Sequence, residues 1–374
     1  MHRTIRIYEE VCIRLLKSGI WGEPVTIPQG FDDWNNVARL AKSQSVLGIV
    51  GNIILSDSIL QSSLDSELRA KVKRFVMGNM LMHNQLNTLV VKSVKHLNDA
   101  GIYPVLLKGQ GLARNYPCPE LRQCGDIDLF VGEELYEKSY FTFKDIATDI
   151  DDFSSIYSGK HFHAFCGKIE FDVHRFSAYY SLKPYNKNYQ EEAAKGLTQN
   201  LTHYVIDDIE VNTPSLEFNA YYIFNHLFNH FLISGIGLRH LCDWMMFLHV
   251  NADKIDRIEL KRILTKMRVM KPWKVFGALC VKKFGMPSGE FPFYEEVNDK
   301  QVFRVMRHIL DEGNFGFETD YYKRNKGGRF RTRFNGIMHH VKRFVHLVTL
   351  FPYQLFRQML NLIAMWYQSI LKRI

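Results

Sequence analysis

The sequence has few cysteines, and they do not form a metal-binding or disulfide pattern. The six thiols are scattered along the 374-residue chain, with no Cys-x-x-Cys pair: Cys12, Cys118, Cys124, Cys166, Cys242 and Cys280. This spacing argues against a zinc ribbon and a disulfide scaffold, and it is typical of reduced thiols. We therefore expect a cytoplasmic protein.

The sequence also lacks a long apolar segment near its start and any low-complexity linker. Glu9 and Glu10 lie in this N-terminal stretch, which argues against a signal peptide. An apolar fraction of 46% and an aromatic fraction of 13% exclude a disordered chain. The length allows two or three domains, or one core with elaborations.

Acidic residues are absent from the C-terminal segment. Residues 321–374 contain eleven Lys and Arg and no Asp or Glu, whereas the preceding 320 residues carry 37 basic and 39 acidic side chains. The net charge of +9 therefore comes entirely from the tail. Because the rest of the chain has no positive excess, we do not expect a long nucleic acid as its partner.

Apolar periodicity changes twice along the chain. Spacings of three and four predict helices, and short apolar runs bounded by Gly predict strands. The predicted helices are 37–55, 66–102, 133–146, 214–235 and 238–255, and the predicted strands lie in 102–109, 124–131 and 160–176, the last a hairpin. The expected fold class is α+β, a small mixed sheet between helical segments. The expected regions are 1–100 (helical), 101–212 (mixed core), 213–320 (helical) and 321–374 (basic tail).

Two carboxylates mark the mouth of one predicted strand, in "CGDIDLFV". Asp126 and Asp128 are two residues apart and therefore share a strand face, where their charges repel unless a divalent cation lies between them. Asp172 lies in the next strong strand pattern, "IEFDVH", with His174 on the same face. Three such carboxylates suit a two-metal phosphoryl-transfer site. Removing any one should relieve repulsion and slightly stabilise the metal-free protein.

A glycine-rich turn precedes this strand. Lys108 and Gly109 end the run "VLLKG", and a predicted helical turn containing Gly111 follows. Glycine permits close approach of a backbone to a phosphate, and N–H groups at a helix start can bind one.

The segment "GIYPVLLKGQGLARNYPCPELRQCGDIDLFV" resembles an uncharacterised branch of the nucleotidyltransferases with the polymerase-beta-like fold. The shared pattern is Leu-Lys-Gly, Tyr-Pro, Arg and Gly-Asp-Ile-Asp-Leu, and the elements at 171–174 and "NHLFNHFLISGIGLRHLCDW" also fit. The resemblance spans roughly residues 60–260 and makes 101–212 the catalytic core. The usual Gly-Ser pair is replaced by Gly109-Gln110-Gly111, which suggests a different handling of the phosphates.

The resemblance implies roles for individual residues. Asp126 and Asp128 would hold a nucleotide-bound metal and Asp172 a catalytic one, with two Mg²⁺ ions expected and Mn²⁺ as the alternative. Expected nucleotide-binding residues are Lys108, Gly109, Gly111, Arg122 and Arg239. The implied reaction transfers a nucleoside monophosphate from a triphosphate to a hydroxyl and releases pyrophosphate. The acceptor is left open among a small molecule, a protein and an RNA end. The alternative is a non-catalytic relative that binds nucleotide or scaffolds partners.

Several histidines and one charged pair are secondary candidates. His161 and His163 alternate on one strand face and suggest zinc when combined with His174, although no fourth ligand is evident. His226 and His230 lie one helical turn apart, as a ligand pair or as a polar stripe on a packed helix. Arg239 and Asp243 are also four residues apart; the default is an intrahelical salt bridge, and the alternative is that Arg239 meets a phosphate.

The C-terminal segment predicts an amphipathic helix. An apolar stripe recurs at Leu355, Phe356, Met359, Ile363, Trp366, Ile370 and Ile374, with Arg357, Asn361, Gln368 and Lys372 opposite. Arg357 and the short uncharged run after it argue against a membrane span. Either the stripe packs on the protein's own core, or residues 341–374 lie on an anionic membrane surface, at the inner face of the membrane.

Overall fold

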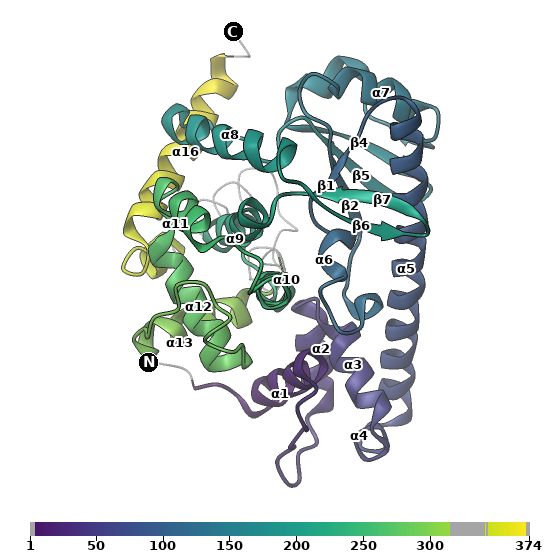
Figure 1. Ribbon diagram of the computed structural model, residues 1–374. Coiled ribbons are helices and arrows are strands. Elements are labelled where there is room, and N and C mark those ends of the chain that lie inside the picture. The colour runs from purple at the N-terminus through teal and green to yellow at the C-terminus, as the bar shows by residue number, and fades with distance from the viewer. Residues whose placement is uncertain (1–3, 315–340, 342, 372–374) are drawn as a thin grey trace.

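A seven-stranded mixed sheet with helices around it forms the protein, which confirms the expected α+β class. The computed structural model describes residues 4–314, 341 and 343–371 (Figure 1). All six cysteines lie among these residues and are free thiols, as expected.

The N-terminal helices lie below the sheet and along one side of it (Figure 1). They are α1 (Ile7–Trp21), α2 (Trp34–Ser43), α3 (Leu47–Ser56), α4 (Ser58–Ser62) and the long α5 (Ser66–Asp99). The single helix predicted over 37–55 is wrong, because Ser45 adopts a φ of 55° and separates α2 from α3. The helix predicted from residue 66 is confirmed: the Asp65 side chain accepts a hydrogen bond from the Leu68 amide at its start.

The sheet has the order β3-β4-β5-β2-β1-β7-β6. Its strands are β1 (Val105–Leu106), β2 (Asp126–Phe130), β3 (Asp149–Ile150), β4 (His161–Cys166), β5 (Ile169–His174), β6 (Thr202–Ile206) and β7 (Ile209–Thr213). Between them lie α6 (Gln110–Ala113), η1 (Pro119–Leu121), α7 (Tyr136–Lys144), η2 (Phe153–Ser158) and α8 (Lys183–Thr198). The predicted hairpin is β4–β5, and β2 runs parallel to β5. The β6–β7 hairpin was not predicted.

The two faces of the sheet differ in chemistry. One face packs against α5 and α7 in an apolar core that includes Leu129, Phe162, Phe171 and Val173. Because side chains alternate along a strand, the residues between these ones point to the opposite face. That second face carries the carboxylates and histidines of β2, β4 and β5, and it faces the C-terminal helices.

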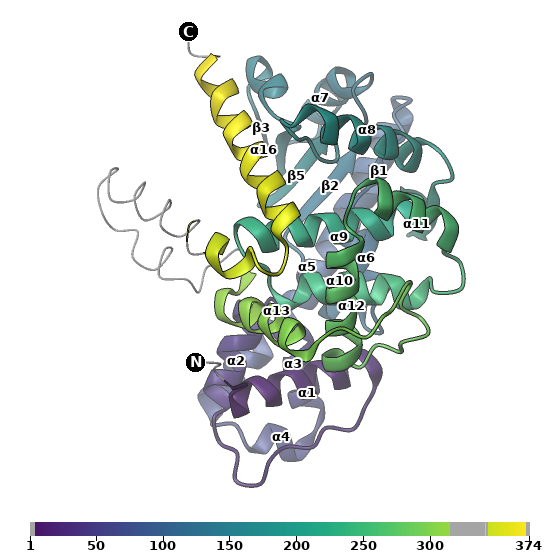
Figure 2. The ribbon, with the colours of Figure 1, turned by 90° about the vertical axis from the view of Figure 1, so that its left-hand side faces the viewer.

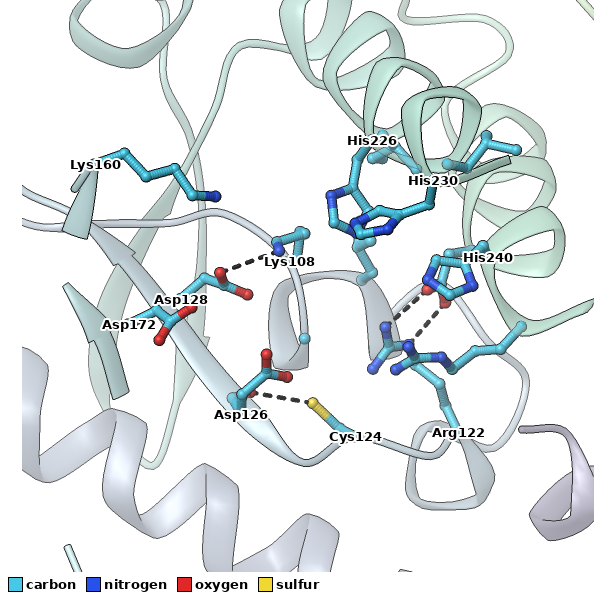
Figure 3. Close-up of a pocket in the computed structure, with 16 residues that line it drawn as sticks. Lys108, Arg122, Cys124, Asp126, Asp128, Lys160, Asp172, His226, His230 and His240 are labelled. Carbon is cyan, nitrogen blue, oxygen red and sulfur yellow. Dashed lines mark hydrogen bonds and ion pairs between the residues drawn. The ribbon is translucent and has the colours of Figure 1, made fainter. Parts of the chain in front are cut away.

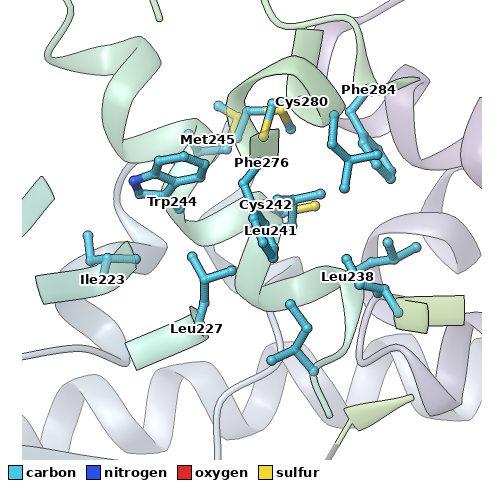
Figure 4. Close-up of a cluster of buried hydrophobic side chains, with 14 of the residues drawn as sticks. Ile223, Leu227, Leu238, Leu241, Cys242, Trp244, Met245, Phe276, Cys280 and Phe284 are labelled. Carbon is cyan, nitrogen blue, oxygen red and sulfur yellow. The ribbon is translucent and has the colours of Figure 1, made fainter. Parts of the chain in front are cut away.

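The C-terminal helices share a core with the N-terminal ones. They are α9 (Leu216–Ile233), α10 (Leu238–Val250), α11 (Arg257–Lys266), α12 (Met270–Phe284) and α13 (Asp299–Glu312). Figure 4 shows the centre of this core, where Trp244 and Phe276 pack with Leu227. The same apolar cluster includes Leu15 and Val50 of α1 and α3. The division at residues 100, 212 and 320 stays a prediction.

The last described helix, α16 (Pro352–Leu371), packs against the rest of the protein with its polar side, which we expected to face outward. The predicted polar side chains Arg357 and Asn361 are buried, whereas Phe356 and Ile363 of the predicted apolar stripe are exposed. Arg357 lies over the ring of Tyr185 at 3.8 Å. For the described part of the stripe, packing on the core is therefore wrong, except at buried Leu355.

The predicted stripe and its opposite face continue beyond what the structure describes. The side chains of Trp366, Gln368, Ile370, Lys372 and Ile374 lie outside the described residues. Within the part that is described, no helix is both long and apolar enough to cross a membrane.

Candidate active site

The three carboxylates singled out in the sequence lie on neighbouring central strands. Asp128 of β2 is directly opposite Asp172 of β5, which is directly opposite His163 of β4. Asp126 begins β2 and is exposed, whereas Asp128 is almost completely buried. The alternation of β2 and β5 thus places Asp126, Asp128 and Asp172 on one face, as the spacing predicts.

The glycine turn brings a cation to this face. Lys108 Nζ lies 3.1 Å from Asp128 Oδ1 (Figure 3). Gly109 has a φ of 55°, and a side-chain Cβ there would lie 3.1 Å from Cys124 Sγ and 3.2 Å from the Asp126 carbonyl oxygen. A larger residue would strain this turn and push it away from β2. The helix after the turn, α6, has only four residues.

Asp128 is held as a carboxylate without any metal. Burial alone would raise its pKa, but the Lys108 charge and a hydrogen bond from His174 hold the pKa well below its usual range. His174 Nε2 lies 2.9 Å from Asp128 Oδ1. Burial lowers the pKa of His174 to about 4, so the ring is neutral near pH 7 and its N–H donates to Asp128. His174, which is fully buried, therefore orients the Asp128 side chain.

The pKa of Asp172 is shifted in the opposite direction. Burial and the neighbouring charge of Asp128 raise its pKa to about 6. His163, whose Nδ1 lies 2.8 Å from Asp172 Oδ1, acts electrostatically in the opposite direction and lowers the pKa of Asp172. Asp172 thus lacks the compensating cation that Asp128 has in Lys108.

A pocket of about 220 Å³ opens over this face and extends to α9 and α10. Asp126, Asp128, Asp172, Lys108 and Lys160 line one end of it (Figure 3). Burial and the charge of Lys108 lower the pKa of Lys160. Sequence reasoning missed Lys160, because it precedes β4 and belongs to no motif; only the fold brings it to the carboxylates.

Arg122 and Arg239 line the other end of the pocket, with different surroundings. Arg122 donates to both oxygens of buried Asp243, at 2.7 and 2.8 Å, and Tyr116 donates to the same carboxylate at 2.8 Å. The default expectation of an Arg239–Asp243 salt bridge is wrong, because Arg122 takes that carboxylate. Among the described residues Arg239 has no ion pair, and its Nη1 donates to the Gln123 carbonyl at 3.1 Å. Arg239 thus remains available to an anion in the pocket.

Three histidines form the helical wall of the pocket. His226 and His230 of α9 have ring centroids 4.6 Å apart, and His240 of α10 lies 5.9 Å from His226 (Figure 3). Burial lowers the pKa of all three, that of His230 to about 4, so they are neutral at physiological pH. Sequence reasoning missed His240, which lies 14 positions from His226 on another helix. His226 and His230 both line the pocket, and their role as a ligand pair stays a prediction.

The donor set of the acidic end fits a divalent metal. Asp128, Asp172 and His174 each offer one ligand atom within 4.8 Å of the others. The repulsion that raises the Asp172 pKa is the kind of conflict that a cation between carboxylates removes. Asp126, two residues before Asp128 on the same face of β2, adds an exposed carboxylate to the lining of the pocket.

A family described as uncharacterised nucleotidyltransferases matches residues 31–285, more than half of the chain. The chain belongs to this family. The matched residues include the sheet, the residues that line the pocket and the three histidines of its helical wall. The match confirms the family resemblance that the Lys-Gly turn and the Asp-Ile-Asp strand indicated. No curated protein and no solved structure matches the chain.

Proposed function

We propose that the protein is a metal-dependent nucleotidyltransferase that moves a nucleoside monophosphate from a triphosphate to a hydroxyl. The observation that carries this proposal is the alignment of Asp128 and Asp172 across parallel strands, with Asp126 beside them, at one end of a pocket that also holds Lys108 and Lys160. Family membership supports transfer of a nucleotidyl group but leaves the acceptor open.

Each charged group has a task in such a reaction. Two Mg²⁺ ions, or Mn²⁺ in their place, held by the three carboxylates would neutralise the triphosphate and acidify the acceptor hydroxyl. Lys108 and Lys160 lie beside the carboxylates and would bind phosphate oxygens, with Arg239 as a third cation farther along the pocket. His174 keeps Asp128 ionised and oriented. A bond forms between the acceptor oxygen and the α-phosphorus, the α–β phosphoanhydride bond breaks, the hydroxyl proton is released, and pyrophosphate leaves. The side chains position and neutralise, without a covalent intermediate.

We place the acceptor beside the histidine wall of the pocket. His226, His230 and His240 are neutral and give this part of the pocket an uncharged polar surface, which suits a hydroxylated molecule. The enclosed volume is small for a macromolecule, so we favour a small hydroxylated acceptor over a protein or an RNA end.

The test is transfer of label from α-³²P-labelled triphosphates. Each of the four ribonucleotides is incubated with a metabolite extract and Mg²⁺ or Mn²⁺, and labelled product and pyrophosphate are measured. We expect both with wild-type protein and neither with EDTA or with Asp126→Asn, Asp128→Asn or Asp172→Asn. Near wild-type turnover in any of the three variants would refute the two-metal assignment. Metal-dependent triphosphate binding without product would favour the non-catalytic alternative.

We further propose that α16 attaches the protein to an anionic membrane surface. The specific observation is its inverted packing: Gln354, Arg357 and Asn361 are buried against the protein, whereas Phe356, Met359 and Ile363 on the other side are exposed. Figure 2 shows α16 along the outside of the molecule. An exposed apolar stripe of this kind is typical of an interfacial helix.

Charge favours lipid over a protein partner for this stripe. Residues 321–374 contain eleven basic and no acidic side chains, and only Arg343 and Arg357 of these are described, both buried. Each basic residue near an anionic membrane contributes about 1 kcal/mol. Co-sedimentation with phosphatidylserine vesicles at low salt tests this. We expect binding by wild type, loss of binding with Phe356→Ser plus Ile363→Ser, and no loss with the control Ile258→Ser, another exposed apolar residue. Equal sedimentation of wild type and the double variant would refute the proposal.

A further inference from the structure

Two histidines of β4 extend the row of carboxylates beyond the pocket. His163 is the cross-strand partner of Asp172, and His161 is the cross-strand partner of His174, so both lie on the same face of the sheet as the carboxylates. Their ring centroids are 4.6 Å apart. The predicted strand pattern put His161 and His163 on one face, but it could not show that Asp172 lies between them and Asp128.

These side chains meet at a distance suitable for one ion. His161, His163 and Asp172 each offer a ligand atom, and the three atoms lie within 4.8 Å of one another. A second such group consists of Asp128, Asp172 and His174, and the two groups share Asp172. Asp172 is therefore placed to contact two cations, as in two-metal sites whose ions are about 3.5–4 Å apart.

The Nδ1 atom of His161 provides independent support. It is buried, has no hydrogen-bond partner among the described residues, and lies 3.8 Å from Asp172 Oδ2. A buried polar atom without a partner is costly in a folded protein unless a ligand satisfies it.

We propose that His161, His163 and Asp172 form an imidazole–carboxylate site for a first-row transition-metal ion, which occupies the catalytic-metal position of the proposed reaction. Two imidazoles and one carboxylate suit Mn²⁺, Fe²⁺, Co²⁺ or Zn²⁺, whereas Mg²⁺ prefers oxygen ligands alone. The nucleotide-bound ion at Asp126 and Asp128 can still be Mg²⁺. The catalytic role rests on the proposed function, but the metal site itself does not.

Pulsed electron paramagnetic resonance with Mn²⁺ tests the ligand set directly. Electron spin echo modulation from ¹⁴N appears when an imidazole nitrogen binds Mn²⁺. We expect this modulation in the wild-type full-length protein with Mn²⁺ alone and its loss in His161→Gln and His163→Gln. The same substitutions should weaken Mn²⁺ binding by roughly tenfold or more in calorimetry and change Mg²⁺ binding much less. His203→Gln, at an exposed histidine of β6, is the matched control and should behave as wild type.

The outcomes separate this site from the proposed function. Wild-type Mn²⁺ spectra without nitrogen modulation overturn the site, whatever the variants do, and so does unchanged Mn²⁺ affinity in both histidine variants. Transfer that needs all three aspartates but neither histidine would keep the proposed function and reject the catalytic role of this site. Nitrogen modulation without transfer to any acceptor would keep the site and count against the function.

Discussion

The metal-free stabilities of Asp172→Asn and Asp128→Asn should differ from wild type in opposite directions. The sequence alone predicts that removing any carboxylate of the cluster stabilises the protein slightly. In the structure, Asp172 is ionised at a cost, whereas Asp128 is stabilised as a carboxylate. The Asp172 pKa of about 6, against an ordinary value of 3.8, corresponds to at most about 3 kcal/mol when the group is ionised in the folded state. Asp172→Asn should therefore raise the free energy of unfolding by about 1–3 kcal/mol at pH 8.

The pH dependence follows from the sign of this shift. Asp172 has a higher pKa in the folded state, so the folded protein binds its proton more tightly. The cost of ionising Asp172 is complete above pH 6 and decreases as the pH falls. The advantage of Asp172→Asn should therefore be largest at pH 8, shrink through pH 6 and disappear near pH 4.

The pKa of Asp128 is shifted in the opposite direction on folding. Its pKa is below the ordinary value because Lys108 and His174 stabilise the carboxylate, so ionised Asp128 contributes stability at neutral pH. Asp128→Asn leaves the largely buried ammonium of Lys108 without its partner. Breaking a buried pair by removing one member costs about 3 kcal/mol or more. Asp128→Asn should thus unfold at a lower temperature than wild type.

Thermal unfolding in EDTA at several pH values measures both effects. Excess Mn²⁺ is the control: it should stabilise wild type by mass action and leave Asp172→Asn nearly unchanged, which reverses their order. The reasoning fails if Asp172→Asn is less stable than wild type in EDTA at pH 8, or if both variants shift in the same direction.

Three further predictions concern the pocket. Lys108→Ala should weaken triphosphate binding roughly tenfold more than monophosphate binding. It should also tighten the binding of Mn²⁺ in the absence of nucleotide. Equal effects on the affinities for both nucleotides would show that Lys108 does not belong to the phosphate site. Arg239→Ala should weaken triphosphate binding, measured by calorimetry, and leave the melting temperature unchanged. Arg122→Ala should lower the melting temperature, because it leaves the buried carboxylate of Asp243 without its partner. The reverse pattern in the two measurements would exchange the roles of the two arginines. His174→Leu should weaken metal binding about 10- to 100-fold, since Asp128 loses its orienting donor, and metal titrations with an unchanged affinity would contradict this.

Local pattern was sufficient to predict the acidic face. The i, i+2 spacing of Asp126 and Asp128 fixes their common side on a strand, and the same rule links Asp172 to His174. It could not show that β2 and β5 are neighbours, because these strands are parallel and separated in sequence by α7, β3, η2 and β4. The predicted β4–β5 hairpin places His163 opposite Asp172, but the position of His161 and His163 near Asp128 depends on the pairing of β2 with β5.

Pairings between distant segments were also beyond the sequence. The i, i+4 rule predicts Arg239 as the partner of Asp243, but Arg122, 121 residues earlier, has the better geometry, with two hydrogen bonds to one carboxylate. Similarly, the periodicity of α16 shows that an apolar stripe exists but not which side of the helix meets the protein. Arg357 packs over Tyr185, and Asn361 accepts a hydrogen bond from the Leu182 amide, so polar contacts decided the orientation.

The contact between Lys108 and Asp128 links metal binding to nucleotide binding. Without metal, the ammonium of Lys108 compensates the buried carboxylate at 3.1 Å, and this is why Asp128 stays ionised. A cation on Asp128 takes over that compensation and repels Lys108, which then needs another anion. Under the proposed function, the triphosphate would supply one in the same pocket. The two ligands should therefore bind together more tightly than separately, and because such coupling is reciprocal, triphosphate should raise metal affinity by the same factor. In the proposed reaction, Lys108 would thus serve as the counter-ion of Asp128 until the nucleotide binds.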